Sequence, residues 1–207
     1  MRKIIFTAIV CSFATIAFAQ NNELSALYTI EKPQGDLGTV YSSGGLFQLT
    51  YAKNTKYKKT YKSTGVTLGY MSMSPIHSTI KYQVPLDTGG MGTATASYST
   101  YKSYQLMANL KSGRQMGKSV ILFWGADIGF NFTSYDYSFH IPGSDEDGSI
   151  RVMRYVLAPK LGVDIALNKN ISLLLQSRYV LSLGKNDNED SILNSYLSFG
   201  GGIGFKF

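Results

Sequence analysis

Several residue types are scarce in this 207-residue chain, and each scarcity excludes a class of function. The only cysteine, Cys11, lies in a segment that we expect to be removed, which excludes disulfides and thiol catalysis from the remainder. His77 and His140 are the only two histidines, so few side chains titrate near neutral pH. After residue 20, no uninterrupted apolar run is long enough for a membrane-spanning helix.

The first residues have the order of a secretory signal peptide. Two basic residues precede an apolar run over residues 4–18, and the run ends in the motif AFA. This order of positive charge, apolar core and small-x-small motif predicts cleavage after Ala19. We therefore expect a signal peptide over 1–19 and one exported domain over 20–207.

What the chain does contain is alternation, and the clearest example is residues 119–137. One parity of this segment is apolar and comprises Val120, Leu122, Trp124, Ala126, Ile128, Phe130 and Phe132. The other parity carries Asp127, Asn131 and Thr133 between glycines. Successive side chains of a strand face opposite sides, so the segment is predicted to be a strand with one apolar face. It is longer than the about 5–6 residues of a typical soluble strand.

Seven further segments alternate in the same way. They are Glu23–Ile30, Gly45–Lys53, Thr64–Met73, Ser103–Leu110, Met153–Leu167, Ile171–Leu183 and Leu197–Phe207. Short turns such as Asn168–Asn170 alternate with long polar connections, which is typical of a membrane barrel. The stretch from Ser74 to about Ala96 is expected to be a long outer segment, with no subdivision assigned.

The sequence therefore predicts an all-β fold, an eight-stranded antiparallel transmembrane β-barrel in up-and-down order. An even number of strands closes the sheet and leaves no unpaired edge in lipid. The alternative is a soluble periplasmic β-sandwich, whose strands also alternate but are usually shorter.

The chain ends LSFGGGIGFKF, with Phe199, Ile203, Phe205 and Phe207 on one parity. This end resembles the C-terminal assembly signal of Gram-negative outer-membrane proteins. The exported chain as a whole resembles the small OmpA/OmpX-like outer-membrane β-barrel family, and its ELSALY start resembles versions found in Bacteroidota. The resemblance implies a location in the cell outer membrane and recognition by the barrel-assembly machinery. It also implies contact with outer-membrane lipids and lipopolysaccharide.

The inward residues predict a polar network. An eight-stranded barrel is just wide enough for side chains to fill, so a filled lumen is expected. Folding the strands back about residues 143–144 predicts Asp127 opposite Lys160, and the next turn predicts Lys160 opposite Arg178. Asp164 is expected nearby. Because charges inside a membrane protein are expensive unless paired, we expect a stabilising ion-pair network; a proton or ion pathway is the alternative.

No catalytic residue, cofactor or metal is predicted. His77 and His140 are expected in outer loops or strand ends, and no nucleophile motif accompanies them. The acidic stretches Ser144–Asp147 and Asn186–Asp190 could offer oxygen ligands to Ca²⁺. Neither has the glycine and distal glutamate of a calcium loop, so solvated loops are the better interpretation.

A basic rim is predicted at the periplasmic turns. Its members are Lys53, Lys56, Lys58, Lys59, Lys62, Lys111, Arg114 and Lys118. Lysine and arginine at such a border meet anionic headgroups, and export argues against nucleic acid as a partner.

The predicted function is a structural or interaction role in which the barrel presents outer loops to ligands or to partner proteins in the membrane. The alternatives are a narrow pore for small solutes and a lipid A-modifying hydrolase or acyltransferase. Membership of a larger assembly stays open.

Overall fold

The computed structural model describes residues 22–85, 90–141, 143–185 and 191–207, so the predicted signal peptide lies outside the described residues. The elements are β1 (Asn22–Gln34), α2 (Gly35–Val40), β2 (Gly44–Tyr57), β3 (Thr60–Met73), β4 (Thr79–Pro85), β5 (Met91–Tyr98), β6 (Tyr101–Met116), β7 (Val120–Ile141), β8 (Ser144–Ala166), β9 (Ile171–Lys185) and β10 (Ser191–Lys206). Within the described part of the chain, no helix has the length and apolarity needed to cross a membrane.

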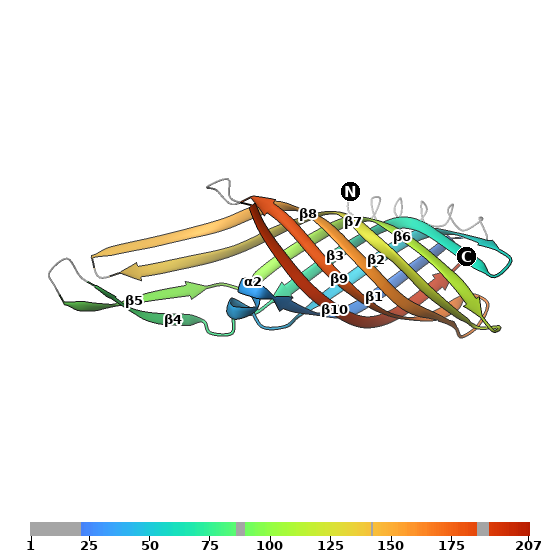
Figure 1. The fold of residues 1–207 in the computed structure, drawn as a ribbon, viewed down its shortest axis with the longest axis horizontal. Helices are drawn as coiled ribbons and strands as arrows, with labels where there is room; N and C mark the ends of the chain where they lie inside the picture. Colours follow the sequence, from blue (N-terminus) through green and yellow to red (C-terminus); the bar gives the residue numbers. More distant parts are fainter. Residues whose placement is uncertain (1–21, 86–89, 142, 186–190) are drawn as a thin grey trace, which may run out of the picture.

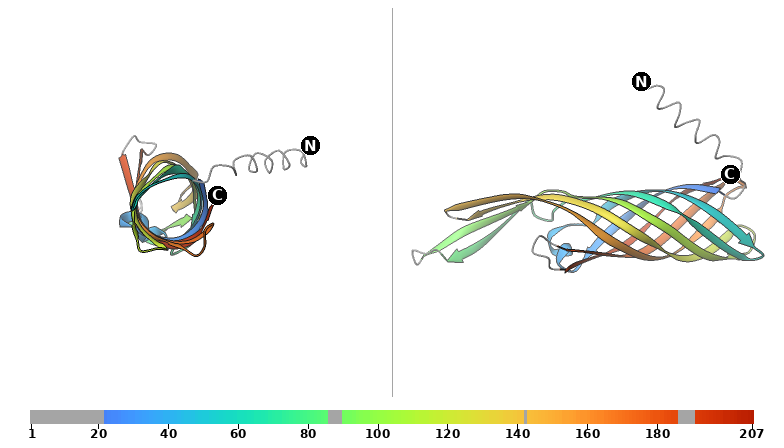
Figure 2. Two further views of the ribbon diagram at one scale, coloured as in Figure 1. Left: turned by 90° about the vertical axis from the view of Figure 1, so that its right-hand side faces the viewer. Right: turned by 90° about the horizontal axis from the view of Figure 1, so that it is seen from above.

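Eight of the ten described strands close into a ring. The order is β1, β2, β3, β6, β7, β8, β9 and β10, and every neighbouring pair is antiparallel. Figure 2 shows the ring in the end view. The two ends of the described chain meet at the seam, where Asn22 and Phe207 exchange two backbone hydrogen bonds of 3.0 Å. The predicted eight-stranded antiparallel barrel is confirmed.

The ring strands have apolar outer faces and polar inner faces. On β7, Trp124 is 57% exposed and Phe132 is 50% exposed, whereas Asp127 is 1% exposed and Asn131 is fully buried. A soluble barrel would have the opposite arrangement. The pattern fits a barrel whose outside is solvated by lipid and whose inside holds the polar groups.

Two strands are much longer than a membrane requires. β7 has 22 residues and β8 has 23, against the about 9–11 residues of a transmembrane strand. The segment that the sequence left undivided forms the hairpin β4–β5, which joins β7 through pairing of Thr95–Tyr98 with Tyr137–His140. We call β4, β5, residues 134–141 of β7 and residues 144–151 of β8 the outer extension; it projects from one end of the ring in Figure 1.

The alternation inverts where the outer extension begins. The face that continues the lumen side becomes apolar, with Glu146 as its charged exception, and carries Ile80, Tyr82, Val84, Ala94, Ala96, Tyr98, Tyr137, Phe139, Ile141 and Ile150. The face that continues the lipid side becomes polar, with Pro85 and Met91 as its apolar exceptions, and carries Thr79, Lys81, Gln83, Thr93, Thr95, Ser97, Ser134, Asp136, Ser138, His140, Asp145, Asp147, Ser149 and Arg151. The inversion indicates that the surrounding solvent changes from lipid to water at this level.

The predicted register of β7 against β8 is wrong by two residues. Asp127 pairs with Ala158, and Lys160 pairs with Gly125. The cause is that the turn closed by the pair Ile141–Ser144 is centred one residue earlier than the predicted centre at residues 143–144, which shifts every pairing by two residues. Gly143 stands in the tight turn with φ 94°, a backbone conformation that glycine adopts without steric cost.

Three of the four glycines of the last strand, Gly200, Gly202 and Gly204, face the lumen, whereas Gly201 shares the outward parity of Phe199 and Ile203. A Cβ at Gly202 would lie 2.0 Å from the carbonyl oxygen of Ala26 on β1, so no side chain fits there. The absence of side chains at the inward glycines of the C-terminal segment therefore allows β10 to approach β1 and close the ring.

Candidate functional site

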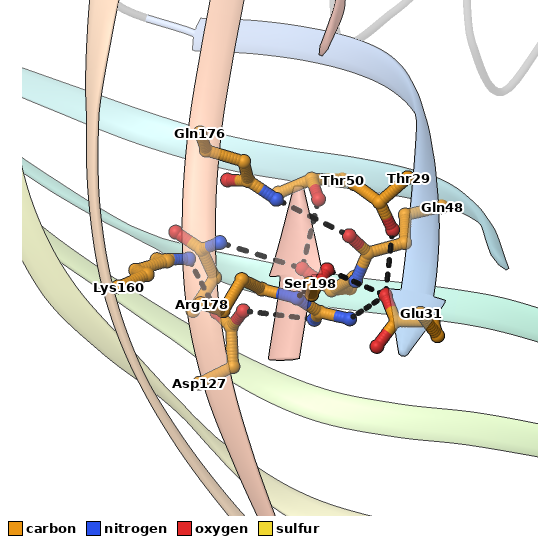
Figure 3. A network of polar contacts seen from close by, with 11 residues as sticks. Thr29, Glu31, Gln48, Thr50, Asp127, Lys160, Gln176, Arg178 and Ser198 are labelled. Carbon is orange, nitrogen blue, oxygen red and sulfur yellow. Dashed lines mark hydrogen bonds and ion pairs between the residues drawn. The ribbon is translucent and has the colours of Figure 1, made fainter. Parts of the chain in front are cut away.

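The lumen holds a buried ion network in which Arg178 on β9 is the central cation. Arg178 Nη2 lies 3.1 Å from Glu31 Oε1, and its Nη1 lies 3.6 Å from Asp127 Oδ2. Lys160 Nζ donates to the other oxygen of Asp127 at 2.5 Å. Ser198 donates a hydrogen bond to Glu31 Oε1 at 2.5 Å. Figure 3 shows how these side chains, which come from the five strands β1, β7, β8, β9 and β10, converge.

The structure thus brings together three of the four predicted network residues. The register pairs Lys160 with Arg178, the pairing expected from the sequence. Asp127 reaches Lys160 although the two are not directly opposite, because the lysine side chain spans the two-residue offset.

Asp164 does not belong to this cluster. Its Oδ2 accepts from Lys206 Nζ at 2.9 Å. Asp164 lies four residues beyond Lys160 on β8, which is about 13 Å along a strand, toward the end of the ring where the two termini meet. Its partner Lys206 stands on β10, which lies on the other side of β9.

A further cluster fills the same end of the lumen. Glu23 on β1 lies 3.5 Å from Lys111 Nζ and accepts a hydrogen bond from Asn54 Nδ2 at 3.0 Å. Lys111 was predicted on the basic rim, but its side chain is 6% exposed and points inward. The reason is parity: Lys111 shares the face of Asn109 and Gln105, which line the lumen.

Sequence reasoning missed Glu23 and Glu31. Both lie on the inward parity of β1 with Ser25 and Thr29, and that alternation was the available signal. It also missed Arg154, which is 4% exposed and whose Nε and Nη1 have no hydrogen-bond partner among the described residues.

The other end of the lumen is closed by apolar and aromatic side chains. The cluster comprises Tyr41, Leu46, Met71, Met73, Tyr101, Met107, Val156, Ala158, Val180 and Tyr196. Tyr101 and Tyr196 join their hydroxyls at 2.8 Å across the ring. Tyr41, in the connection between α2 and β2, packs edge-on against Tyr101, and burial raises the pKa of the Tyr41 hydroxyl. These groups separate the ion network from the outer end.

Between the two ends, the described lumen is filled. A cavity of about 10 Å³ lies among polar side chains that include Gln48, Asn109 and Gln176. That volume is about the size needed for one water molecule. The arrangement therefore suits a stable plug rather than an open conduit.

The two histidines lie outside the ring. His140 contacts Asp145 across the β7–β8 hairpin, and both side chains are 68% exposed. His77 is also exposed. In the part of the chain that the structure describes, no serine hydroxyl bonds to either histidine, and no group of three or more metal-ligating side chains occurs. Of the acidic stretches, Ser144–Asp147 is strand, and Asn186–Asp190 lies outside the described residues.

The predicted assembly-signal residues face outward. Phe199, Ile203 and Phe205 are about half exposed on the lipid side of β10, and Phe207 pairs with Asn22 at the seam. Their role as a signal stays a prediction.

These features define the chain as a small transmembrane β-barrel with a filled lumen. No known family model matches the sequence, and no curated protein matches it. The fold is similar to that of small outer-membrane β-barrel proteins of known structure.

Three solved structures illustrate the similarity. Neisserial surface protein A is 14% identical, with 90% of this chain and 97% of that chain covered and a TM-score of 0.48. Ail of Yersinia pestis is 14% identical, with 91% of this chain and 100% of that chain covered and a TM-score of 0.48. The outer membrane protease OmpT from Escherichia coli is 8% identical, with 92% of this chain and 98% of that chain covered and a TM-score of 0.51. At these identities the likeness concerns the fold alone, and the Bacteroidota type stays a prediction.

Proposed function

We propose that the protein is an integral barrel of a bacterial outer membrane that holds the outer extension in the external medium for contact with partner molecules. The observation that carries this proposal is the continuation of β7 and β8 beyond the lipid-facing band as a regular sheet with the hairpin β4–β5. A sheet that only had to span the membrane would end at the band.

The outer extension offers strand edges. Among the described residues, β4 has one strand neighbour, β5, and β8 has no partner on its β9 side before Tyr155. Exposed edges present unpaired backbone groups, which is how many domains add a strand from a partner. The ring itself has no such edge, so contact with partners belongs to the outer extension.

Site-specific crosslinking on intact cells tests the proposal. A photoreactive side chain at Gln83, on the β4 edge, is expected to capture a defined protein partner. The same group at Leu106, on the lipid-facing side of β6, serves as the control and is expected to capture none. Equal yields at both positions, or no protein adduct at Gln83, would contradict the proposal.

Location is tested separately. Membrane fractionation should recover the protein in the outer membrane, and the folded band on an unheated gel should shift on boiling.

The narrow-pore alternative makes an opposite prediction. Since the described lumen is filled by the ion network and the aromatic cluster, purified protein in planar bilayers should give no stepwise conductance. Regular single-channel steps would restore the pore as the better function.

A lipid-modifying activity is the other alternative. Mass spectrometry of lipid A should show no change on expression, and the loss of an acyl chain would overturn the non-enzymatic proposal.

A further inference from the structure

Basic side chains stand where the lipid-facing band ends on β6, β7 and β8. The last apolar row of outward residues on these strands consists of Tyr104, Phe132 and Met153. The next outward row consists of Lys102, Ser134 and Arg151, which are in register with one another. Aromatic girdles mark the level of the headgroups in membrane barrels. The basic row therefore lies at the level of the outer headgroups.

The basic row borders a surface depression of about 270 Å³, lined also by Ser99, Thr100, Tyr135 and Asp136. The depression lies where β5 ends and β6 begins along one side of β7. Ser99, in the break between β5 and β6, binds to β7. Its N–H donates to the carbonyl of Asp136 at 2.9 Å, and its hydroxyl accepts from the Asp136 N–H at 2.7 Å. The break is thus a fixed part of the sheet.

The lining suits a tetrahedral dianion. Lys102 and Arg151 are both exposed, and neither forms an ion pair among the described residues. Their strands flank β7, so their Cα atoms are about 10 Å apart, and two long side chains can converge on one group above Ser134. Arginine matches phosphate with two parallel N–H donors, and lysine adds a point charge. The hydroxyl of Ser134 is a further donor.

The geometry points to a site for a phosphate group of the outer-leaflet glycolipid, formed by Lys102, Ser134 and Arg151. The inference rests on the proposed placement of the barrel in an outer membrane, because that placement puts a phosphorylated headgroup beside this row. The lipid's acyl chains would then lie along Tyr104, Phe132 and Met153, immediately below the cations.

Asp136 provides a test of the charge of the bound group. Its carboxylate lines the same depression, two residues beyond Ser134 on the same face. A carboxylate repels phosphate, so Asp136→Asn should tighten binding of a phosphorylated lipid. If the site instead held a cation, the same substitution should weaken binding.

Native mass spectrometry of the folded barrel in a non-ionic detergent measures the binding. The probes are bisphosphorylated lipid A, the same lipid after enzymatic removal of its phosphates, and inorganic phosphate. Removing one cation near a charged headgroup should weaken binding about fivefold, so Lys102→Gln and Arg151→Gln together should weaken it about twenty-five-fold. Lys81→Gln, a lysine on β4 away from the band, is the matched control and should change nothing. The dephosphorylated lipid should bind weakly and equally to all variants.

Two results would overturn the inference. One is binding of bisphosphorylated lipid A that is unchanged in the double variant. The other is binding of inorganic phosphate alone with the same dependence on Lys102 and Arg151 while the lipid shows none. A heat-shift gel on each variant confirms that the barrel is folded. A wild type that never forms a heat-shifting barrel would refute the proposed function itself. A folded barrel that binds lipid A equally with and without its phosphates would refute only this site.

Discussion

The ring and the outer extension are built from the same strands, yet they place their apolar side chains on opposite faces. On β7, Phe130 and Phe132 point away from the lumen, whereas Tyr137 and Phe139 point to the lumen side. Between them β7 pairs with β8 without a break, while the neighbour on its other side changes from β6 to β5. The difference shows that the solvent on each side, not the strand geometry, decides which parity is apolar.

The largest effect is expected from the ion network of the ring. Arg178→Met would leave Asp127 and Glu31 without their shared cation, and breaking a buried pair in this way costs about 3–5 kcal/mol. Urea-induced unfolding in lipid vesicles measures the loss.

Arg154→Met is the matched control for that substitution. Arg154 is also buried but has no carboxylate partner among the described residues, so its removal should cost less than about 1 kcal/mol or stabilise the barrel. Equal losses for the two arginines would show that pairing does not hold the ring together.

The second effect concerns the level at which the two regions meet. Ile128→Arg places a charge on the lipid face near the middle of the band, which should cost about 2–4 kcal/mol. Ser138→Arg continues the same parity into the outer extension and should cost nothing measurable, because that face is solvated by water. Both are measured by the same unfolding assay. A similar cost at both positions would refute the assigned boundary.

The third effect should be confined to the outer extension. Phe139 packs against Tyr98 and Tyr137, with ring centroids 6.3 Å and 5.5 Å away. Phe139→Asp should remove aromatic contacts of about 0.5–1.5 kcal/mol each and expose the β5–β7 junction to protease. Ser138→Asp, on the polar face, is the control. The melting temperature of the ring should stay unchanged in both, and a fall would mean that the two regions unfold together.

The smallest effect is expected from removing the hairpin. Replacing Thr79–Ser97 with a short glycine-serine linker deletes β4 and most of β5, which make no contact with lipid-facing rows. Closing a shorter loop changes the free energy of unfolding by about 0.6 kcal/mol per halving of length, so the heat shift of the ring should persist. Loss of the folded band would show that the hairpin is needed for the ring.

The ring could be predicted from the sequence because its evidence is local. Alternation over residues 119–137 requires only the period of a strand, and eight such segments separated by turns suffice for closure. The hairpin β4–β5 was not recognised, because its strands have only seven and eight residues and the apolar parity of β5 consists largely of the small residues Ala94 and Ala96. So short and weak an alternation does not stand out in the sequence.

The lumen network could be predicted only in part because it depends on pairing between distant strands. Lys160 and Arg178 are joined by a short turn, so counting back from Asn168–Asn170 finds their register. Glu31 reaches Arg178 across β10, and that neighbour relation exists only after the sheet closes. No spacing in the sequence expresses such a contact.

The seam between Asn22 and Phe207 also bears on how the barrel folds. The two residues stand at opposite ends of the described chain, so this contact has nearly the greatest sequence separation available to it. Contacts of high sequence separation form slowly, because the chain must lose loop-closure entropy before it gains the energy of the contact. Until β10 arrives, β1 is an open edge inside lipid. Formation of the ring is therefore a late, concerted event, and an assisting surface that shields β1 would set its rate.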